Sequence, residues 1–183
     1  NGAGKTTTLR MLLGIIDPDE GFRRILGAER PHDVAHAIGY LPEERGLYPS
    51  MKTYEAIAFI GALRGLPLAE GRRRGKAMLE EHGLGYAIDR QIRQLSKGMA
   101  QQVQLLGTLV HDPRLVVFDE PFSGLDALNQ GKLEKMIFVF ADTATTGSYT
   151  SCQPRSAHRA LSSSTTPSAR SRSATWAICC STS

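Results

Sequence analysis

Seven residues at the start of the chain have the types and order that phosphate binding requires. They match the second part of the phosphate-loop pattern G-x-x-x-x-G-K-[ST], and in order they are Asn1, Gly2, Ala3, Gly4, Lys5, Thr6 and Thr7. Glycines let backbone N–H groups approach phosphate oxygens, and a following helix adds the positive end of its dipole. Lys5 supplies positive charge, and the Thr6 hydroxyl is placed to bind Mg²⁺. Taken alone, the pattern also fits an ordinary glycine turn before an amphipathic helix.

A pair of carboxylates follows the apolar run at residues 115–118. This run, Leu-Val-Val-Phe, predicts a strand buried on both faces of a parallel sheet, and Asp119 and Glu120 come next. The carboxyl end of such a strand lies beside the phosphate loop. Asp119 could then hold Mg²⁺, and Glu120 could orient or deprotonate a water that attacks a phosphate. The alternative is a pair of acids that only cap a turn.

Three further segments stand in a definite order around this pair. Residues 95–99 read Leu-Ser-Lys-Gly-Met, about ninety positions after Lys5, and Ser96 is a good N-cap for a helix. Residues 40–43 read Tyr-Leu-Pro-Glu, and residues 123–126 read Ser-Gly-Leu-Asp directly after the carboxylate pair.

The order and spacing of these segments resemble those of the ATP-binding subunits of ABC transporters over about residues 1–140. In that family the segment at 95–99 reads L-S-G-G-Q. The residues that match Ser96 and Gly98 reach the γ-phosphate of an ATP held by a second subunit in a head-to-tail dimer. Residues 123–126 are similar to the D-loop, which crosses the dimer interface and includes Asp126.

This chain departs from the family pattern at three of these positions. Glu43 stands where the family has a glutamine that senses Mg²⁺, and a carboxylate there can still bind the ion. Lys97 and Met99 replace a glycine and the glutamine of the signature. Residues 42–48, together with residues 95–99, make the chain look like the branch that serves ABC-2-type exporters, which includes bacterial sodium-efflux ATPases.

The resemblance implies an ATPase subunit that powers export through a transmembrane permease. ATP and Mg²⁺ are the expected cofactors, and the partners are the permease and a second ATP-binding subunit. The protein would be cytoplasmic, at the inner face of the cell membrane, and would touch the membrane only through its partner. The alternatives are an ABC-type ATPase of DNA repair or chromosome maintenance, and a catalytically silent fragment. We expect no nucleic-acid partner, because residues 1–140 hold 18 basic and 17 acidic residues.

Taken together, the motifs and the resemblance assign a role to each candidate site residue. Glu120 and Lys5 are the expected catalytic residues, and Thr6, Asp119 and Glu43 are the expected Mg²⁺ ligands. The expected nucleotide-binding residues are Asn1, Gly2, Ala3, Gly4, Lys5, Thr6, Thr7, Glu43, Ser96, Gly98 and Asp126.

Alternating strands and helices must position these residues, which predicts an α/β fold. A helix is expected directly after the phosphate loop, and strands are expected at 22–26, 37–41 and 115–118. Further helices are expected at 53–63, 68–82 and 128–140, and Thr53 is the expected N-cap of the helix at 53–63. The fold class is therefore a P-loop NTPase core of the ABC ATPase type, with a mainly parallel sheet and a helical subdomain at about 46–95.

The composition changes after about residue 140. Residues 141–183 are rich in Ser, Thr and Arg and contain all three cysteines, so neither a disulfide framework nor a zinc site is expected in residues 1–140. We expect this tail to be frameshifted or disordered, and the N-terminal and C-terminal strands of the family domain to be missing. For that reason we also expect the chain by itself not to hydrolyse ATP. The sequence shows neither a signal peptide nor a membrane helix.

Overall fold

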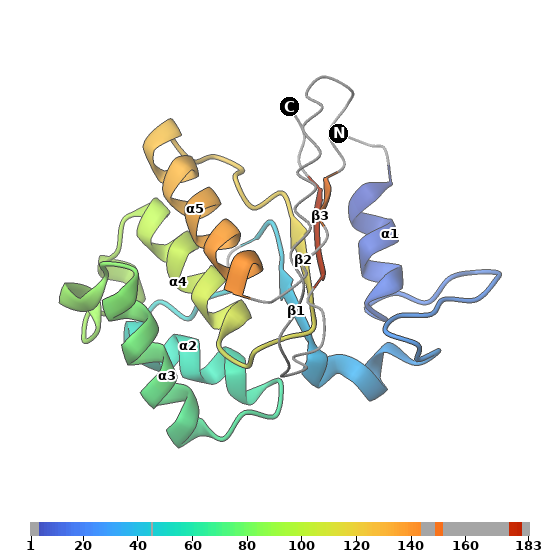
Figure 1. Ribbon diagram of the computed structural model, residues 1–183, viewed down its shortest axis with the longest axis horizontal. Helices are drawn as coiled ribbons and strands as arrows, with labels where there is room; N and C mark the ends of the chain where they lie inside the picture. Colours follow the sequence, from blue (N-terminus) through green and yellow to red (C-terminus); the bar gives the residue numbers. More distant parts are fainter. Residues whose placement is uncertain (1–3, 45, 144–148, 152–175, 181–183) are drawn as a thin grey trace, which may run out of the picture.

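The computed structural model describes residues 4–44, 46–143, 149–151 and 176–180. Within these residues, four strands form one parallel sheet in the order β1-β2-β4-β3 (Figure 1). The strands are β1 (Ile38–Leu41), β2 (Leu115–Asp119), β3 (Tyr149–Ser151) and β4 (Trp176–Cys180). The parallel sheet confirms the predicted α/β class.

Strand β2 occupies the centre of the sheet, between β1 and β4. Its register places Val117 opposite Tyr40 of β1 and opposite Ile178 of β4. All five residues of β2 are buried, as expected for a strand covered on both faces of a parallel sheet. The carboxyl end of this strand carries Asp119.

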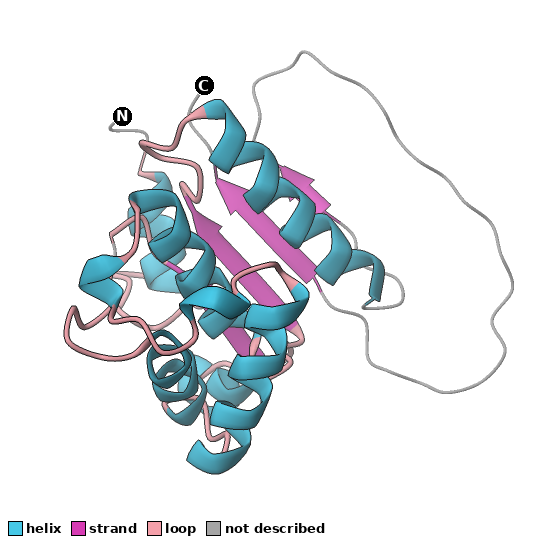
Figure 2. Ribbon diagram, turned by 90° about the vertical axis from the view of Figure 1, so that its left-hand side faces the viewer, coloured by secondary structure: helices cyan, strands magenta, loops and turns pink. Residues whose placement is uncertain are grey.

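Helices cover both faces of the sheet, as Figures 1 and 2 show. Helix α1 (Lys5–Leu12) lies on one face, and α4 (Lys97–Leu109) and α5 (Ala127–Thr143) lie on the other. Beyond α4 lie α2 (Thr53–Ala62) and α3 (Leu68–Glu81). Short 3₁₀ helices at Pro31–Ala37, Gly85–Ala87 and Ile92–Gln94 connect these elements. No helix among the described residues combines the length and apolar character needed to cross a membrane.

Alternate residues of β2 belong to two separate hydrophobic clusters. Leu115 and Val117 pack with Leu9 of α1 in a small cluster, which we call the α1-face core. Val116 and Phe118 pack in a larger cluster on the opposite face, built mainly from α2, α4 and α5, which we call the α4-face core. The two-residue period of a strand explains this division.

Most of the predicted elements within residues 1–143 are confirmed, but two local predictions are wrong. Residues 22–26 do not form a strand, since the only pairing there is an isolated bridge between Ile25 and Ala28, and Phe22 is 89% exposed. Thr53 is the first helical residue and not the cap of α2. Its hydroxyl donates a hydrogen bond to the carbonyl oxygen of Arg90 at 2.9 Å, which holds α2 to the segment before α4.

The structure differs from the sequence expectation in the tail. Strands β3 and β4 both come from residues beyond 140, and β4 pairs with β2 along its whole length. The average Ser/Thr-rich composition concealed the short run Trp176–Cys180, which is apolar enough to pair with a central strand. Residues 144–148, 152–175 and 181–183 lie outside the described residues, so the expectation of a frameshifted or disordered segment stays a prediction there.

Candidate nucleotide-binding site

The first element of the site is a hydrogen bond between two residues that are 113 positions apart. The Thr6 Oγ1 hydroxyl donates to Asp119 Oδ1 at 3.1 Å. Thr6 lies in the first turn of α1, and Asp119 is the last residue of β2, so helix and strand meet where the strand ends. The Thr6 proton is directed to the carboxylate, which leaves oxygen lone pairs of the hydroxyl for another partner.

Gly4 is the one residue of the turn before α1 that the structure describes. Gly4 is the N-cap and has φ of +69°, a conformation that glycine adopts without steric cost. Among the described residues, no heavy atom lies within 4 Å of the position that a Cβ would take there, so Gly4 is open on that side. The carbonyl oxygen of Gly4 accepts hydrogen bonds from the backbone N–H and the hydroxyl of Thr8, at 2.8 and 2.9 Å.

The other predicted loop residues are placed only in part. Lys5 is the first residue of α1, and Thr7 follows in the same turn with an exposed side chain. Asn1, Gly2 and Ala3 lie outside the described residues.

Tyr40 is a second partner of Asp119. Its hydroxyl donates to Asp119 Oδ2 at 3.3 Å, while Asp119 itself is only 1% exposed. Burial and the nearby charge of Asp119 raise the pKa of Tyr40, and these effects outweigh the lowering by Arg10. The hydroxyl therefore keeps its proton at neutral pH and remains a donor. Thr6 and Tyr40 together occupy both oxygens of one buried carboxylate.

Glu120, the predicted water-activating residue, lies directly after Asp119. Its backbone has φ of +50°, which is unusual for a residue with a side chain and turns the chain sharply at the end of β2. The N–H of Ser123 donates to the carbonyl oxygen of Glu120 at 3.1 Å and closes this turn. From helix α4, Gln101 Nε2 donates to the carbonyl oxygen of Pro121 at 3.1 Å. The loop that carries Glu120 is thus fixed on both sides.

Glu43, the third predicted Mg²⁺ ligand, lies two residues after β1 and has an exposed side chain. The next residue, Glu44, has a carbonyl oxygen that accepts a hydrogen bond from Gln104 Nε2 at 3.3 Å. Gln104 is 4% exposed, so a buried amide of α4 holds the start of this loop. The described contacts do not join the Glu43 side chain to Asp119.

Ser96, Gly98 and Asp126 form a second group at the beginnings of α4 and α5. The N–H of Met99 donates to Ser96 Oγ at 3.2 Å, which confirms Ser96 as the N-cap of α4. A Cβ on the buried Gly98 would collide with the side chain of Asn129. Asn129 in turn donates from its side-chain amide to Asp126, and this hydrogen bond lowers the pKa of the carboxyl group.

These two groups lie on opposite sides of the sheet. Figure 1 shows α1 on one face and the starts of α4 and α5 on the other. The structure therefore brings Thr6 and Asp119 together, but it does not bring Ser96, Gly98 and Asp126 to them.

The chemistry of the first group fits a magnesium ion bound with phosphate oxygens. Hydroxyl and carboxylate oxygens are the ligand atoms that Mg²⁺ prefers, and proteins commonly hold this ion through one or two such groups plus phosphates. Among the described residues, no group of three or more His, Cys, Asp or Glu side chains forms a metal centre by itself. A site of two protein oxygens beside an open glycine turn suits a metal–nucleotide complex better than a bare ion.

Comparison with known proteins identifies the family. The ABC transporter family model matches residues 1–123. The chain belongs to the ABC transporter family. An uncharacterized ABC transporter ATP-binding protein of Alkalihalophilus pseudofirmus is 38% identical over 146 residues, which cover 80% of this chain and 55% of the relative. The ABC transporter ATP-binding protein NatA of Bacillus subtilis is 36% identical over 141 residues, which cover 75% and 57%.

A solved structure described as the ATP-binding subunit of an ABC transporter has the same fold. It matches with a TM-score of 0.64 and 33% identity, over 78% of this chain and 61% of that chain. This match supports the predicted P-loop ATPase core of the ABC type. The chain spans about half the length of the curated relatives it matches.

Three residues that contact the site were not predicted from the sequence, namely Tyr40, Gln101 and Gln104. A signal for the glutamines was present, since α4 is otherwise apolar and yet carries Gln101, Gln102 and Gln104, each of them 5% exposed or less. Buried amides require hydrogen-bond partners, which indicates that loops must approach this helix. Tyr40 gave no such signal, because a tyrosine in a strand is ordinary.

Proposed function

We propose that this chain binds ATP together with Mg²⁺ through the turn before α1 and the end of β2. The observation that carries the proposal is the hydrogen bond between Thr6 and the buried Asp119. It joins a glycine turn at a helix N-terminus to a carboxylate at the end of a parallel strand, which is the arrangement that phosphate binding in this fold requires.

Each predicted site residue has a role in this proposal. The backbone of residues 1–4, with Lys5 and Thr7, would hold the phosphates, and Thr6 and Asp119, with Glu43, would hold Mg²⁺. The ion supplies charge neutralisation between the phosphates when bound. Glu120 directly follows Asp119 on a sharply turned backbone, and it would orient or deprotonate the water that attacks the γ-phosphate.

Ser96, Gly98 and Asp126 would act on an ATP held by another subunit. They lie at the starts of α4 and α5, which cover the face of the sheet opposite α1 (Figure 1). A head-to-tail dimer would place them there, with the N-terminus of α4 directed to the γ-phosphate. The same separation supports the expectation that a single chain does not hydrolyse ATP.

We also propose that ATP hydrolysis drives a transmembrane permease. The protein would act in the cytoplasm at the inner face of the cell membrane and would contact the membrane through that partner. Export, in the ABC-2-type and sodium-efflux branch, is the direction that residues 42–48 favour. The family match and the transporter relatives do not favour the alternative of a DNA-repair ATPase.

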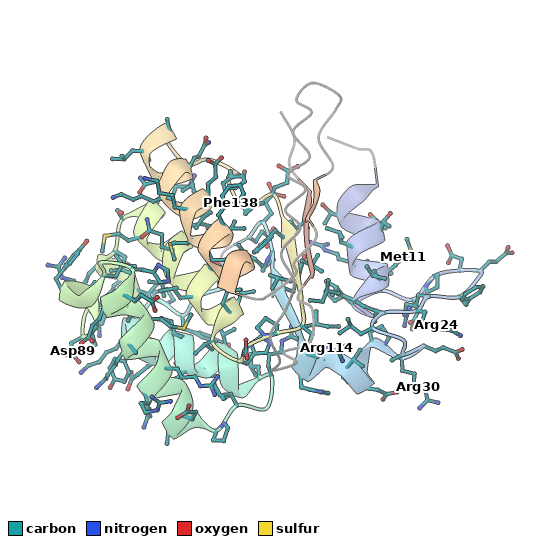
Figure 3. All side chains as sticks on the ribbon, in the orientation of Figure 1. Met11, Arg24, Arg30, Asp89, Arg114 and Phe138 are labelled. Carbon is teal, nitrogen blue, oxygen red and sulfur yellow. The ribbon has the colours of Figure 1, made fainter. Side chains whose placement is uncertain are left out.

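Binding of a fluorescent ATP analogue, with and without Mg²⁺, tests the nucleotide site. Asp119→Asn should weaken Mg²⁺-dependent binding by at least about tenfold, because the neutral amide loses the charge that attracts the ion. Asp89→Asn is the matched control, since Asp89 is an exposed carboxylate at the far end of the molecule that pairs with Lys52 (Figure 3). Equal binding by the Asp119 variant and the unmodified chain would contradict the proposal.

Hydrolysis is measured separately with the same purified chain. Glu120→Gln should preserve binding of the Mg²⁺–nucleotide complex while removing any turnover, since the amide cannot accept a proton. Turnover by the single chain that Glu120→Gln abolishes would confirm the role of Glu120. It would also overturn the expectation that a lone chain is inactive.

A further inference from the structure

Asp119 accepts hydrogen bonds on both of its oxygens, from two different elements. Thr6 of α1 occupies Oδ1, and Tyr40 of β1 occupies Oδ2. The terminal torsion of an aspartate is broad and roughly two-fold, so one hydrogen bond leaves the carboxylate free to rotate. Two donors on separate oxygens fix its plane.

The sheet holds Tyr40 in place for this contact. Tyr40 lies opposite Val117 in the parallel register of β1 and β2, two residues before Asp119 on the same strand. Residues two apart on a strand share a face, so Val117 and Asp119 both face α1. The position of the hydroxyl is therefore set by paired backbone and not by a flexible loop.

Helix α1 also lies near the same tyrosine, because Tyr40 packs against the α1-face core that includes Leu9. The charge of Arg10, one turn after Thr6, lowers the pKa of Tyr40, but burial and the charge of Asp119 outweigh it. Arginine can only donate, so the proton of the hydroxyl remains available for Asp119. Asp119 of β2 is thus hydrogen-bonded to Thr6 of α1 and to Tyr40 of β1, so its two hydrogen bonds connect the three elements that form the site.

We propose that Tyr40 is a positioning residue for Mg²⁺, which orients the Asp119 carboxylate so that it and Thr6 can hold the ion together. This inference rests on the proposed nucleotide function. The simpler reading is that Tyr40 is only a packed strand residue whose hydroxyl has found a partner. The two readings differ in whether loss of the hydroxyl changes the response to Mg²⁺ or only the stability of the chain.

A Mg²⁺ titration of fluorescent ATP analogue binding separates the two readings. Tyr40→Phe should raise the Mg²⁺ concentration for half-maximal binding by about tenfold or more, the usual effect of losing one hydrogen bond to a charged group. Affinity for the analogue in EDTA should stay within about twofold, because Tyr40 acts through the metal ligand. Tyr48→Phe is the matched control, since Tyr48 is 57% exposed and contacts Phe59 through its ring.

Each outcome decides a different claim. No Mg²⁺-dependent binding by the unmodified chain would overturn the proposed function and this inference with it. Normal binding by the unmodified chain, with an unchanged Mg²⁺ midpoint in Tyr40→Phe, would overturn the inference alone. Equal loss of binding with and without Mg²⁺ would show a purely structural role and would also overturn it. Tyr40→Met, which removes the hydroxyl but keeps a long apolar side chain, replaces Tyr40→Phe if that variant does not fold.

Discussion

The two faces of the sheet differ in what their buried residues do. On the α1 face a small core of five described residues, among them Leu9 and Val117, lies beside the polar contacts of Asp119. On the α4 face a much larger core joins α2, α3, α4 and α5. The proposed Mg²⁺ ligands Thr6 and Asp119 therefore lie on the face with the smaller described core, and most of the apolar burial is on the other. Changes on the two faces should affect different properties.

The largest expected effect is a cavity in the α4-face core. Leu106 is fully buried in α4, so Leu106→Ala should lower the free energy of unfolding by about 2–5 kcal/mol, through lost burial and an unfilled cavity. Leu9→Ala makes the same change in the α1-face core, where the smaller cluster should relax more easily, and should cost about 2 kcal/mol or less. Urea unfolding of both variants measures the difference. Equal losses of unfolding free energy in the two variants would contradict the difference proposed between the two faces.

A smaller change in the free energy of unfolding is expected from a substitution at Gly98, a predicted site residue on the α4 face. Gly98→Ala would push a methyl group into the Asn129 side chain and disturb its hydrogen bond to Asp126, at a cost of about 1–3 kcal/mol. Gly131→Ala is the control, because Gly131 lies in α5 and no described atom comes within 4 Å of the position of an added Cβ. That change should stabilise the chain by about 0.5–1 kcal/mol. If urea unfolding shows that Gly98→Ala also stabilises the chain, the claim that Gly98 of α4 packs closely against Asn129 of α5 is contradicted.

The smallest effect concerns pH and His111, which follows α4. Burial is the main cause that lowers the pKa of His111 to about 4, from a usual value of 6.5. Its Nε2 lies 3.2 Å from the carbonyl oxygen of Ile38, so Nε2 carries the proton of the neutral ring. The buried Nδ1 has no hydrogen-bond partner among the described residues.

The unfolded chain therefore binds a proton on this histidine more readily than the folded chain does. The contribution of neutral His111 is complete above pH 6.5 and is lost as the pH falls from 6.5 to about 4. Allowing for solvent screening, the loss should be about 1–2 kcal/mol. Urea unfolding of His111→Gln across this range should show a flatter pH dependence than the unmodified chain. Identical curves for the His111 variant and the unmodified chain would exclude this source of pH dependence.

Local patterns predicted most of the elements that carry the site. The apolar run before Asp119 predicted β2, and the serine at position 96 predicted the start of α4, because burial on both faces and N-capping leave clear local signals. The prediction of a strand at residues 22–26 was wrong, because an apolar residue at position 22 does not show whether a neighbouring strand is available to pair with it. The tail strands were missed because a short strand gains its stability from β2 and not from its own composition.

The sequence by itself determined the chemistry that is present. The glycine turn, Lys5, Thr6 and the Asp119–Glu120 pair are covalent neighbours or belong to single elements, so their types and order can be read directly. Tertiary structure alone decided which groups meet. It placed Tyr40 on Asp119, attached the loops at Glu44 and Pro121 to buried glutamines of α4, and put α1 and α4 on opposite faces of the sheet. Such contacts depend on strand register and helix packing between residues distant in sequence, and no local pattern specifies them.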